Sequence, residues 1–172
     1  YLHSSDRFIL PAGGCEIRGA HPRGFRYVTV DVWSPSGTTE LADLSAWEEL
    51  YPFDMHNFFA CSDPALERYA AKAAETVRLC STDAFLDCTT RERVQWMEDL
   101  YMHGHVSGYA FGDTRLLRRA LIQGAQCQLP DGRINGFMPS ERINCAFASS
   151  SLSWLCLLSE YWMFSGDETV ME

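Results

Sequence analysis

The chain has 172 residues, enough for a domain with its own hydrophobic core. Hydrophobic residues make up 47% and charged residues 22%, a composition typical of folded globular proteins and not of disordered ones. The formal net charge is −9, and thirteen Arg stand beside one Lys, Lys72, without a basic stripe interleaved with aromatics. Nucleic acid is therefore excluded as a partner, because a polyanion needs a positively charged face. An uncharged partner fits this charge balance best.

The same composition argues against membranes and metals. No apolar run is long enough to span a bilayer, so no membrane partner is expected. The seven cysteines show no C-x-x-C spacing, and His103 and His105 have no second pair of ligands nearby. We therefore expect no metal ion and no other cofactor. Unpaired cysteines favour a reducing compartment such as the cytoplasm and leave secretion open.

Residues 1–60 are predicted to differ from the rest of the chain. The alternating, β-branched stretch 26–33 predicts a strand, and Pro and Gly residues before it indicate turns. Residues 8–10 could form a second short strand, and residues 34–61 are predicted to be an irregular connector.

From about residue 61 the hydrophobic period becomes helical. Asp63 and Pro64 predict the N-cap and the first position of a helix. Further helices are predicted from about 92 to 111, from Asp113 onwards, and from about 149 to 164. The first helix should bury one face, made of Leu66, Tyr69, Ala70, Ala73, Val77 and Cys80. The third should align Leu117, Ala120, Leu121 and Gly124, and the fourth should bury Leu152, Leu155, Cys156 and Trp162.

A short pattern recurs in the helical region. Gly112 is followed by Asp113, and Gly166 by Asp167, so that a helix-ending Gly stands directly before an Asp that can start the next helix. The interval leaves room for two helices and their loops. Recurring helical hairpins of this size suggest an α/α toroid or a solenoid.

The segment 87–99 carries the residues best suited to chemistry. Cleavage of a glycosidic bond needs one carboxylic acid to protonate the leaving oxygen and a second carboxylate across the ring. If the chain is helical from Glu92 onwards, Glu92, Trp96 and Asp99 share one face, with two acids flanking an aromatic plate. The alternative is that these residues have no catalytic role, because acids near a helix N-terminus and Glu/Arg neighbours on a solvated face are common.

The stretch from Asp83 to Asp99, DAFLDCTTRERVQWMED, resembles the signature of bacterial α-L-rhamnosidases of glycoside hydrolase family 78, roughly Asp-Cys-Pro-x-Arg-Glu-x-x-x-Trp-x-Gly-Asp. The similarity continues at 109–115, 128–132 and 165–167. Upstream, residues 23–28 resemble the last β-domain strand of that family, and 59–64 the entry to its first barrel helix. The resemblance thus covers nearly the whole chain.

The resemblance implies a mainly α fold, a partial (α/α)6 six-hairpin toroid preceded by a short β segment. Residues 1–60 would be the end of a β-sandwich-like domain and a connector, and residues 61–172 the N-terminal part of the catalytic barrel. The implied activity is inverting hydrolysis of terminal α-L-rhamnosides. By position in the motif, Glu92 would be the general acid, Asp87 and Asp99 would bind sugar hydroxyls, Trp96 would lie against the ring, and Arg91 would support the acids.

The family's catalytic base is a Glu from a later hairpin, and it has no counterpart here. The expected partners are therefore a rhamnoside substrate and the remainder of a larger catalytic domain. The sequence departs from the pattern at Thr89, in place of Pro, and at Glu98, in place of Gly. The stretch 149–152, Ser-Ser-Ser-Leu, also lacks an acid that members often show there.

Two alternatives stay open at this point. One keeps the six-hairpin barrel but acts on another sugar or by another reaction. The other is a non-catalytic carbohydrate-binding fragment, for which Glu98 and the serine run would be signs of decay.

Overall fold

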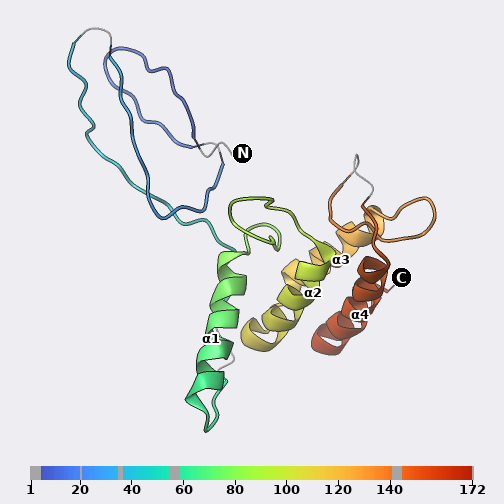
Figure 1. The fold of residues 1–172 in the computed structure, drawn as a ribbon. Coiled ribbons are helices and arrows are strands. Elements are labelled where there is room, and N and C mark those ends of the chain that lie inside the picture. Colours follow the sequence, from blue (N-terminus) through green and yellow to red (C-terminus); the bar gives the residue numbers. More distant parts are fainter. Residues whose placement is uncertain (1–4, 20, 35–36, 55–58, 141–144, 172) are drawn as a thin grey trace. The chain divides into compact units, whose positions relative to one another are not determined.

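The computed structural model describes residues 5–19, 21–34, 37–54, 59–140 and 145–171. The chain divides into two compact units, Tyr1–Glu49 and Leu50–Glu172. The described residues contain four α-helices and one short π-helix, all within the second unit (Figure 1). None of these helices is both long and apolar enough to cross a membrane. The prediction of a mainly α fold is confirmed for this part of the chain.

The first unit is extended chain, and its described residues include no strand (Figure 1). The prediction of strands at 8–10 and 26–33 is therefore wrong. An alternating pattern forms a stable strand only when a partner strand pairs with it and another layer covers its apolar face. Here Tyr27 and Trp33 stay 85% and 84% exposed, and no described segment forms a ladder with theirs. An ion pair between Arg23 Nη2 and Asp6 Oδ1, at 2.6 Å, links two segments of this unit.

Helix α1, Pro64–Leu79, begins where the sequence predicts. Asp63 is its N-cap, and Asp63 Oδ1 accepts a hydrogen bond from the backbone N–H of Ala65 at 2.8 Å. The predicted inner face is only partly correct. The helix buries Ala74 and Val77 in its C-terminal half, whereas Leu66 and Tyr69 near its start are exposed.

Helix α2, Met97–Val106, continues into the π-helix η1, Ser107–Phe111. The predicted end at Gly112 is confirmed, because Gly112 has the left-handed conformation (φ +63°) that terminates helices. The predicted start near residue 92 is wrong by about one turn. Arg93 has φ +52°, which a right-handed helix does not allow, and the backbone N–H of Asp87 donates to Val94 O at 3.0 Å. Residues 87–96 therefore form a loop.

Helix α3, Arg115–Gln126, follows directly, and α4, Ala148–Ser165, closes the described fold. The N-cap of α3 is Thr114, so the prediction that Asp113 caps this helix is wrong by one residue. Asp113 Oδ1 nevertheless accepts from the backbone N–H of Arg115, the first residue of the helix, at 3.0 Å. Helix α4 ends at Gly166, with φ +67°, as predicted. The predicted inner residues of α3 are all buried: Leu117, Ala120, Leu121 and Gly124.

The predicted buried face of α4 is wrong. Residues expected inside are exposed, with Leu152 at 64%, Leu155 at 57% and Trp162 at 43%. Helix α4 has apolar residues on both sides, so periodicity alone could not select the side that faces its neighbours. The residues that it buries are Ser150, Leu157, Leu158 and Tyr161.

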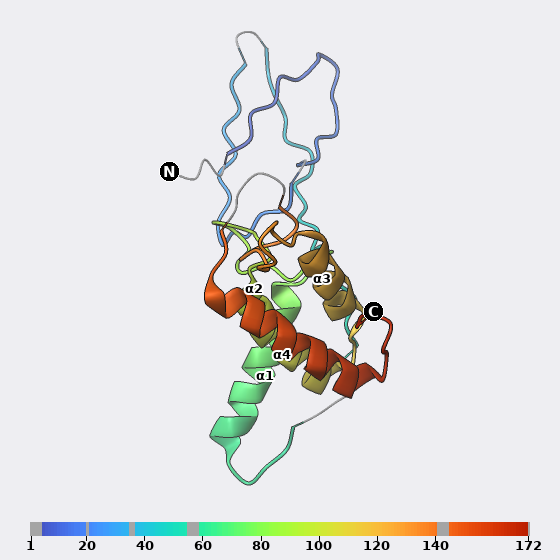
Figure 2. The ribbon, with the colours of Figure 1, turned by 90° about the vertical axis from the view of Figure 1, so that its right-hand side faces the viewer.

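Helices α2, α3 and α4 lie side by side and share one core (Figures 1 and 2). The approach of α2 to α4 is close at Gly104, where a Cβ atom would lie 2.9 Å from Leu157 Cδ2. The largest fully buried apolar side chains in this core are Phe85, Phe111, Met97, Leu100, Leu117, Leu121, Met138 and Leu157. This core fixes the N-terminal end of α2, which is also the end of the segment 87–99.

Candidate active site

A closed loop carries Glu92. Two hydrogen bonds join its ends, Asp87 and Val94. The backbone N–H of Asp87 donates to Val94 O, and Asp87 Oδ1 accepts from the backbone N–H of Val94 at 2.8 Å. Within the loop, the backbone N–H of Glu92 contacts Cys88 Sγ at 3.4 Å. The positive φ of Arg93 then turns the chain towards α2. The loop therefore presents Glu92 from a conformation fixed at its base.

Gln95 fixes the chain between this loop and α2. It is buried (3% exposed), and its Oε1 accepts from the backbone N–H of Phe85 at 3.3 Å. Its Nε2 donates to Gln123 Oε1 at 3.0 Å and to Met138 O at 3.3 Å. Every polar atom of this amide is thus used, as a buried polar side chain requires. Sequence reasoning missed Gln95, although a Gln between Val94 and Trp96 at the entrance to an apolar helix was an available signal.

The neighbouring residues are held by a second segment. The backbone N–H of Met97 donates to Gly136 O at 2.8 Å, and the rings of Trp96 and Phe137 meet edge to face with centroids 5.0 Å apart. On its other side Gly136 approaches residue 145, where a Cβ atom would lie 2.4 Å from Cys145 O, so a larger residue does not fit. The indole of Trp96 is therefore positioned by contacts from residues 136–137 as well as by the place of Trp96 at the N-cap of α2.

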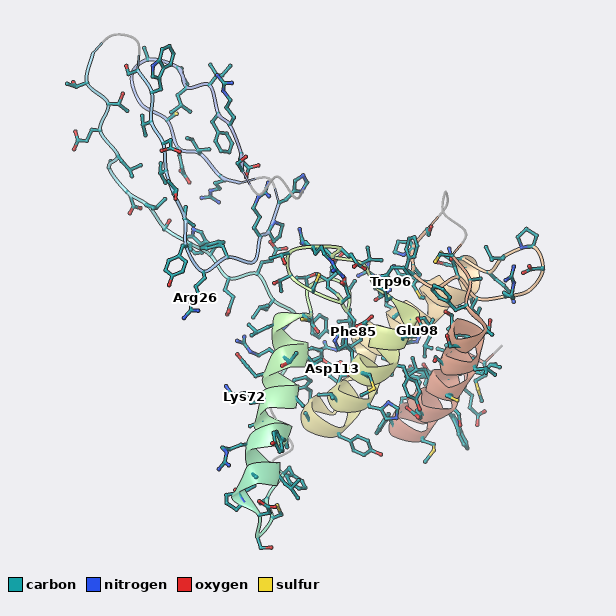
Figure 3. All side chains as sticks on the ribbon, viewed as in Figure 1. Arg26, Lys72, Phe85, Trp96, Glu98 and Asp113 are labelled. Atoms are coloured by element: carbon teal, nitrogen blue, oxygen red, sulfur yellow. The ribbon has the colours of Figure 1, made fainter. Side chains whose placement is uncertain are left out.

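Glu92 and Trp96 contact each other directly. The indole Nε1 of Trp96 donates to Glu92 Oε2 at 2.7 Å, and Arg91 Nη2 donates to Glu92 Oε1. The prediction that Glu92, Trp96 and Asp99 share one helical face is wrong, since α2 begins only at Met97. The loop nevertheless brings Glu92 to the indole. Figure 3 shows Trp96 at the N-terminal end of α2, close to Glu98.

These side chains line one open pocket of about 580 Å³, a volume in the range of small-ligand sites. All five residues predicted to form the site are among those that line it. Whether each has its predicted role stays a prediction. The complete lining is Asp87, Cys88, Thr90, Arg91, Glu92, Trp96, Glu98 and Asp99.

The pocket concentrates negative charge around a partly buried carboxyl group. Burial raises the pKa of Asp99, and the charge of Asp87 raises it further. Weaker effects in the same direction come from Glu98 and Glu92. A carboxyl group with a raised pKa takes up a proton at a higher pH than an ordinary Asp does.

His103 lies one turn beyond Asp99 along α2. Its side chain is 8% exposed, its ring centroid is 5.6 Å from that of Phe85, and its Nδ1 has no partner among the described residues. Burial lowers the pKa of His103 to about 4, against the opposing effect of the charge on Asp87. His103 is therefore neutral at pH 7.

Glu98 and the serine run, Ser149–Ser151, make hydrogen bonds next to the pocket. Glu98 Oε1 accepts hydrogen bonds from Ser149 Oγ at 2.8 Å and from Ser150 Oγ at 2.9 Å. Ser151 Oγ accepts from the backbone N–H of Ile134 at 3.0 Å. The sequence identified Glu98 only as a departure from a pattern, and its serine partners, about 50 residues away, gave no signal.

A metal site is absent from the part of the chain that the structure describes, since no three His, Cys, Asp or Glu residues there are arranged to hold an ion. All seven cysteines are free thiols.

The part of the chain that contains this pocket is similar to known proteins. Residues 54–172 match the bacterial alpha-L-rhamnosidase six-hairpin glycosidase domain. The chain belongs to this family. A GH78 family rhamnosidase of Bacillus sp. GL1, known from its crystal structure, is similar at 28% sequence identity and a TM-score of 0.63 over 70% of this chain. A rhamnosidase from Klebsiella oxytoca, solved with rhamnose bound, is similar at 23% identity and a TM-score of 0.57 over 68% of this chain. No curated protein matches the chain.

Membership in the rhamnosidase family confirms the resemblance seen in the segment 83–99. The matched residues include all four α-helices and the pocket, so the described helices are part of a six-hairpin domain. The similarity to the Klebsiella oxytoca rhamnosidase, at 23% identity, shows the shared fold alone. The chain spans 13% of the Bacillus rhamnosidase and 24% of the Klebsiella one.

Proposed function

We propose that this protein, in its full length, is a glycoside hydrolase that cleaves terminal α-L-rhamnosides with inversion, and that Glu92 is its general acid. The observation that carries the proposal is the position of Glu92. It lies in a pocket whose lining holds every residue of the rhamnosidase motif to which a role was given, within a domain of the rhamnosidase family.

The contacts of Glu92 suit an acid that must be aimed at one oxygen atom. Proton transfer to a leaving group requires the donor within hydrogen-bond reach of that atom, so the side chain has to be held in one orientation. Trp96 and Arg91 each bind one of the two oxygens of Glu92. These two contacts restrict the rotation of the carboxyl group while leaving it in the wall of the pocket.

The other residues would bind and orient the sugar. Asp87 and Asp99 can accept hydrogen bonds from its hydroxyls, and the apolar face of Trp96 can lie against its C–H groups. In an inverting mechanism a second carboxylate activates a water molecule on the opposite face of the ring, with the two carboxyl groups roughly 6.5–9.5 Å apart. We propose that this base comes from the remainder of the catalytic domain.

The test is the Glu92→Gln variant of the full-length protein, assayed with two aryl α-L-rhamnosides. 4-Nitrophenolate is a poorer leaving group than 2,4-dinitrophenolate and gains more from protonation, so hydrolysis of the 4-nitrophenyl rhamnoside should fall by about 10²- to 10⁴-fold. A 2,4-dinitrophenyl leaving group departs as a stable anion, so its hydrolysis should fall far less. A purely structural role of Glu92 would slow both substrates equally, and unchanged turnover of the 4-nitrophenyl rhamnoside would refute the assignment.

Glu168→Gln is the matched control, because it makes the same chemical change at an exposed residue outside the pocket. It should hydrolyse both substrates at the parental rate. Inversion is tested separately by proton NMR of the first product formed, which should be β-L-rhamnose.

Glu98 and the serine run do not support a decayed, non-catalytic fragment. Both are joined by hydrogen bonds that tie the start of α2 to the start of α4. A panel of aryl glycosides and uronate polymers would distinguish a rhamnosidase from a six-hairpin enzyme that acts on another sugar.

A further inference from the structure

The pocket wall carries a carboxylate that the rhamnosidase pattern lacks. Glu98 stands at the Gly position of that pattern, in the first turn of α2. Its Oε1 accepts from the hydroxyls of Ser149 and Ser150, both in the first turn of α4. Ser150 is fully buried. Two hydroxyl groups from another helix therefore hold the Glu98 side chain in the pocket wall, where it would otherwise be free to turn into solvent.

The second oxygen of Glu98 remains available to a ligand. Among the residues that the structure describes, none donates a hydrogen bond to Oε2 of Glu98. An ionised carboxylate can accept about four hydrogen bonds, so Glu98 retains acceptor capacity after both serine contacts. Figure 3 shows its side chain at the same end of α2 as Trp96, which also lines the pocket.

The charges of the lining are unbalanced. Four of its side chains are carboxyl groups, and the one guanidinium, Arg91, already contacts Glu92. A negatively charged ligand group would enter a field that solvent screens only in part, whereas a hydroxyl or a cation would meet acceptors. Glu98 adds to this field at the position where the family pattern has no side chain.

We propose that Glu98 is a specificity-determining residue that restricts the site to glycosides without a negative charge and favours a cationic group on the aglycone. This inference rests on the proposed hydrolysis of rhamnosides and names the substrate class within it. It concerns the charge of Glu98 and not its bulk. The two can be separated, because Gln keeps the size and an acceptor oxygen for the serines while Gly removes both.

The experiment compares two substrates on the full-length protein and its variants. One is 4-nitrophenyl α-L-rhamnoside, which is neutral, and the other is its 3-carboxy derivative, which carries one negative charge. At low ionic strength, Glu98→Gln should raise the ratio of kcat/KM for the anionic over the neutral substrate about five- to tenfold, as expected for two charges roughly 10 Å apart near a protein surface. Salt should reduce this gain, because it screens the interaction in the parent protein. Intrinsic differences between the leaving groups cancel, since each variant is measured with the same pair.

Glu98→Gly should raise the ratio to the same extent, and Glu168→Gln, which removes an exposed charge outside the pocket, should leave it unchanged. If both Glu98 variants keep the kcat/KM ratio of the parent, or if only Glu98→Gly changes it, the inference is overturned. The proposed function would still stand in that case, as long as the neutral substrate is hydrolysed. If the parent protein cleaves neither substrate, the proposed function is refuted and this inference with it. A 3-aminomethyl derivative should behave oppositely, losing kcat/KM relative to the neutral substrate in both Glu98 variants.

Discussion

Asp87 closes the loop that holds Glu92, so its removal should affect both the loop and catalysis. The Asp87→Ala substitution deletes the carboxylate that accepts from the backbone N–H of Val94, and it leaves the backbone bond between the same two residues in place. The loop would then be closed by one hydrogen bond instead of two. We expect it to open more often and to present Glu92 less accurately.

The magnitude follows from the kind of hydrogen bond. A bond to a charged group contributes about 1.5–3 kcal/mol when buried, and partial exposure of Asp87 lowers this to about 1–2 kcal/mol. An opening equilibrium that shifts by this amount changes about 5- to 30-fold. The Asp87→Asn variant keeps an oxygen acceptor for Val94, so it should open much less, although it loses the charge proposed to bind the sugar.

Amide hydrogen exchange of residues 88–95, followed by mass spectrometry, measures this local opening in the full-length protein. Asp87→Ala should exchange about 5- to 30-fold faster than the parent. Asp83→Ala is the control, because Asp83 is an exposed acid in the same connection, 3.6 Å from Arg119 Nη2, and has no contact with Val94. Equal exchange in Asp87→Ala and the parent would show that the carboxylate does not hold the loop. Rhamnoside kcat/KM should fall in both Asp87 variants.

Two further predictions concern pH. The pKa of His103 is about 4 in the folded state, so between pH 6.5 and 4 only the unfolded state takes up a proton at this residue. The free energy of unfolding should therefore fall by up to about 3 kcal/mol as the pH falls through this range. Urea unfolding of the His103→Gln variant should lack this pH dependence. The sign is opposite for Asp99, because its raised pKa means that stability is lost as pH rises above the ordinary value. Asp99→Asn should therefore be more stable than the parent at pH 7 in the same assay while hydrolysing rhamnosides more slowly, and a lower stability would contradict the burial argument.

The ends of the helices could be predicted because local chemistry determines them. Asp63 supplies the side-chain acceptor that a first turn needs, and Gly112 and Gly166 adopt positive φ where the helices stop. Each of these effects acts within a few residues of the chain. The motif also named five of the eight residues that line the pocket, because resemblance to a family does not depend on the local conformation. Their roles stay predictions.

The predictions from sequence were wrong where the conformation depends on residues far away in the chain. The start of α2 depends on Gln95, whose amide joins Phe85, Gln123 and Met138, and no short window of sequence contains these partners. The buried side of α4 depends on which neighbours pack against a helix that has apolar residues on both sides. The strand predicted at 26–33 required a pairing partner that the described residues do not provide.

The late start of α2 has a consequence for the pocket. The first turn of a helix has backbone N–H groups without a partner inside the helix and a partial positive charge, and in α2 this turn contains Glu98 and Asp99. A helix that began at Glu92 would place that positive end more than one turn away and would pair these N–H groups within the helix. With the start at Met97, the helix end lies beside the acids and offsets part of their mutual repulsion. The loop conformation of 87–96 therefore leaves the positive end of α2 at the group of carboxylates, which a helix that began at Glu92 would not do.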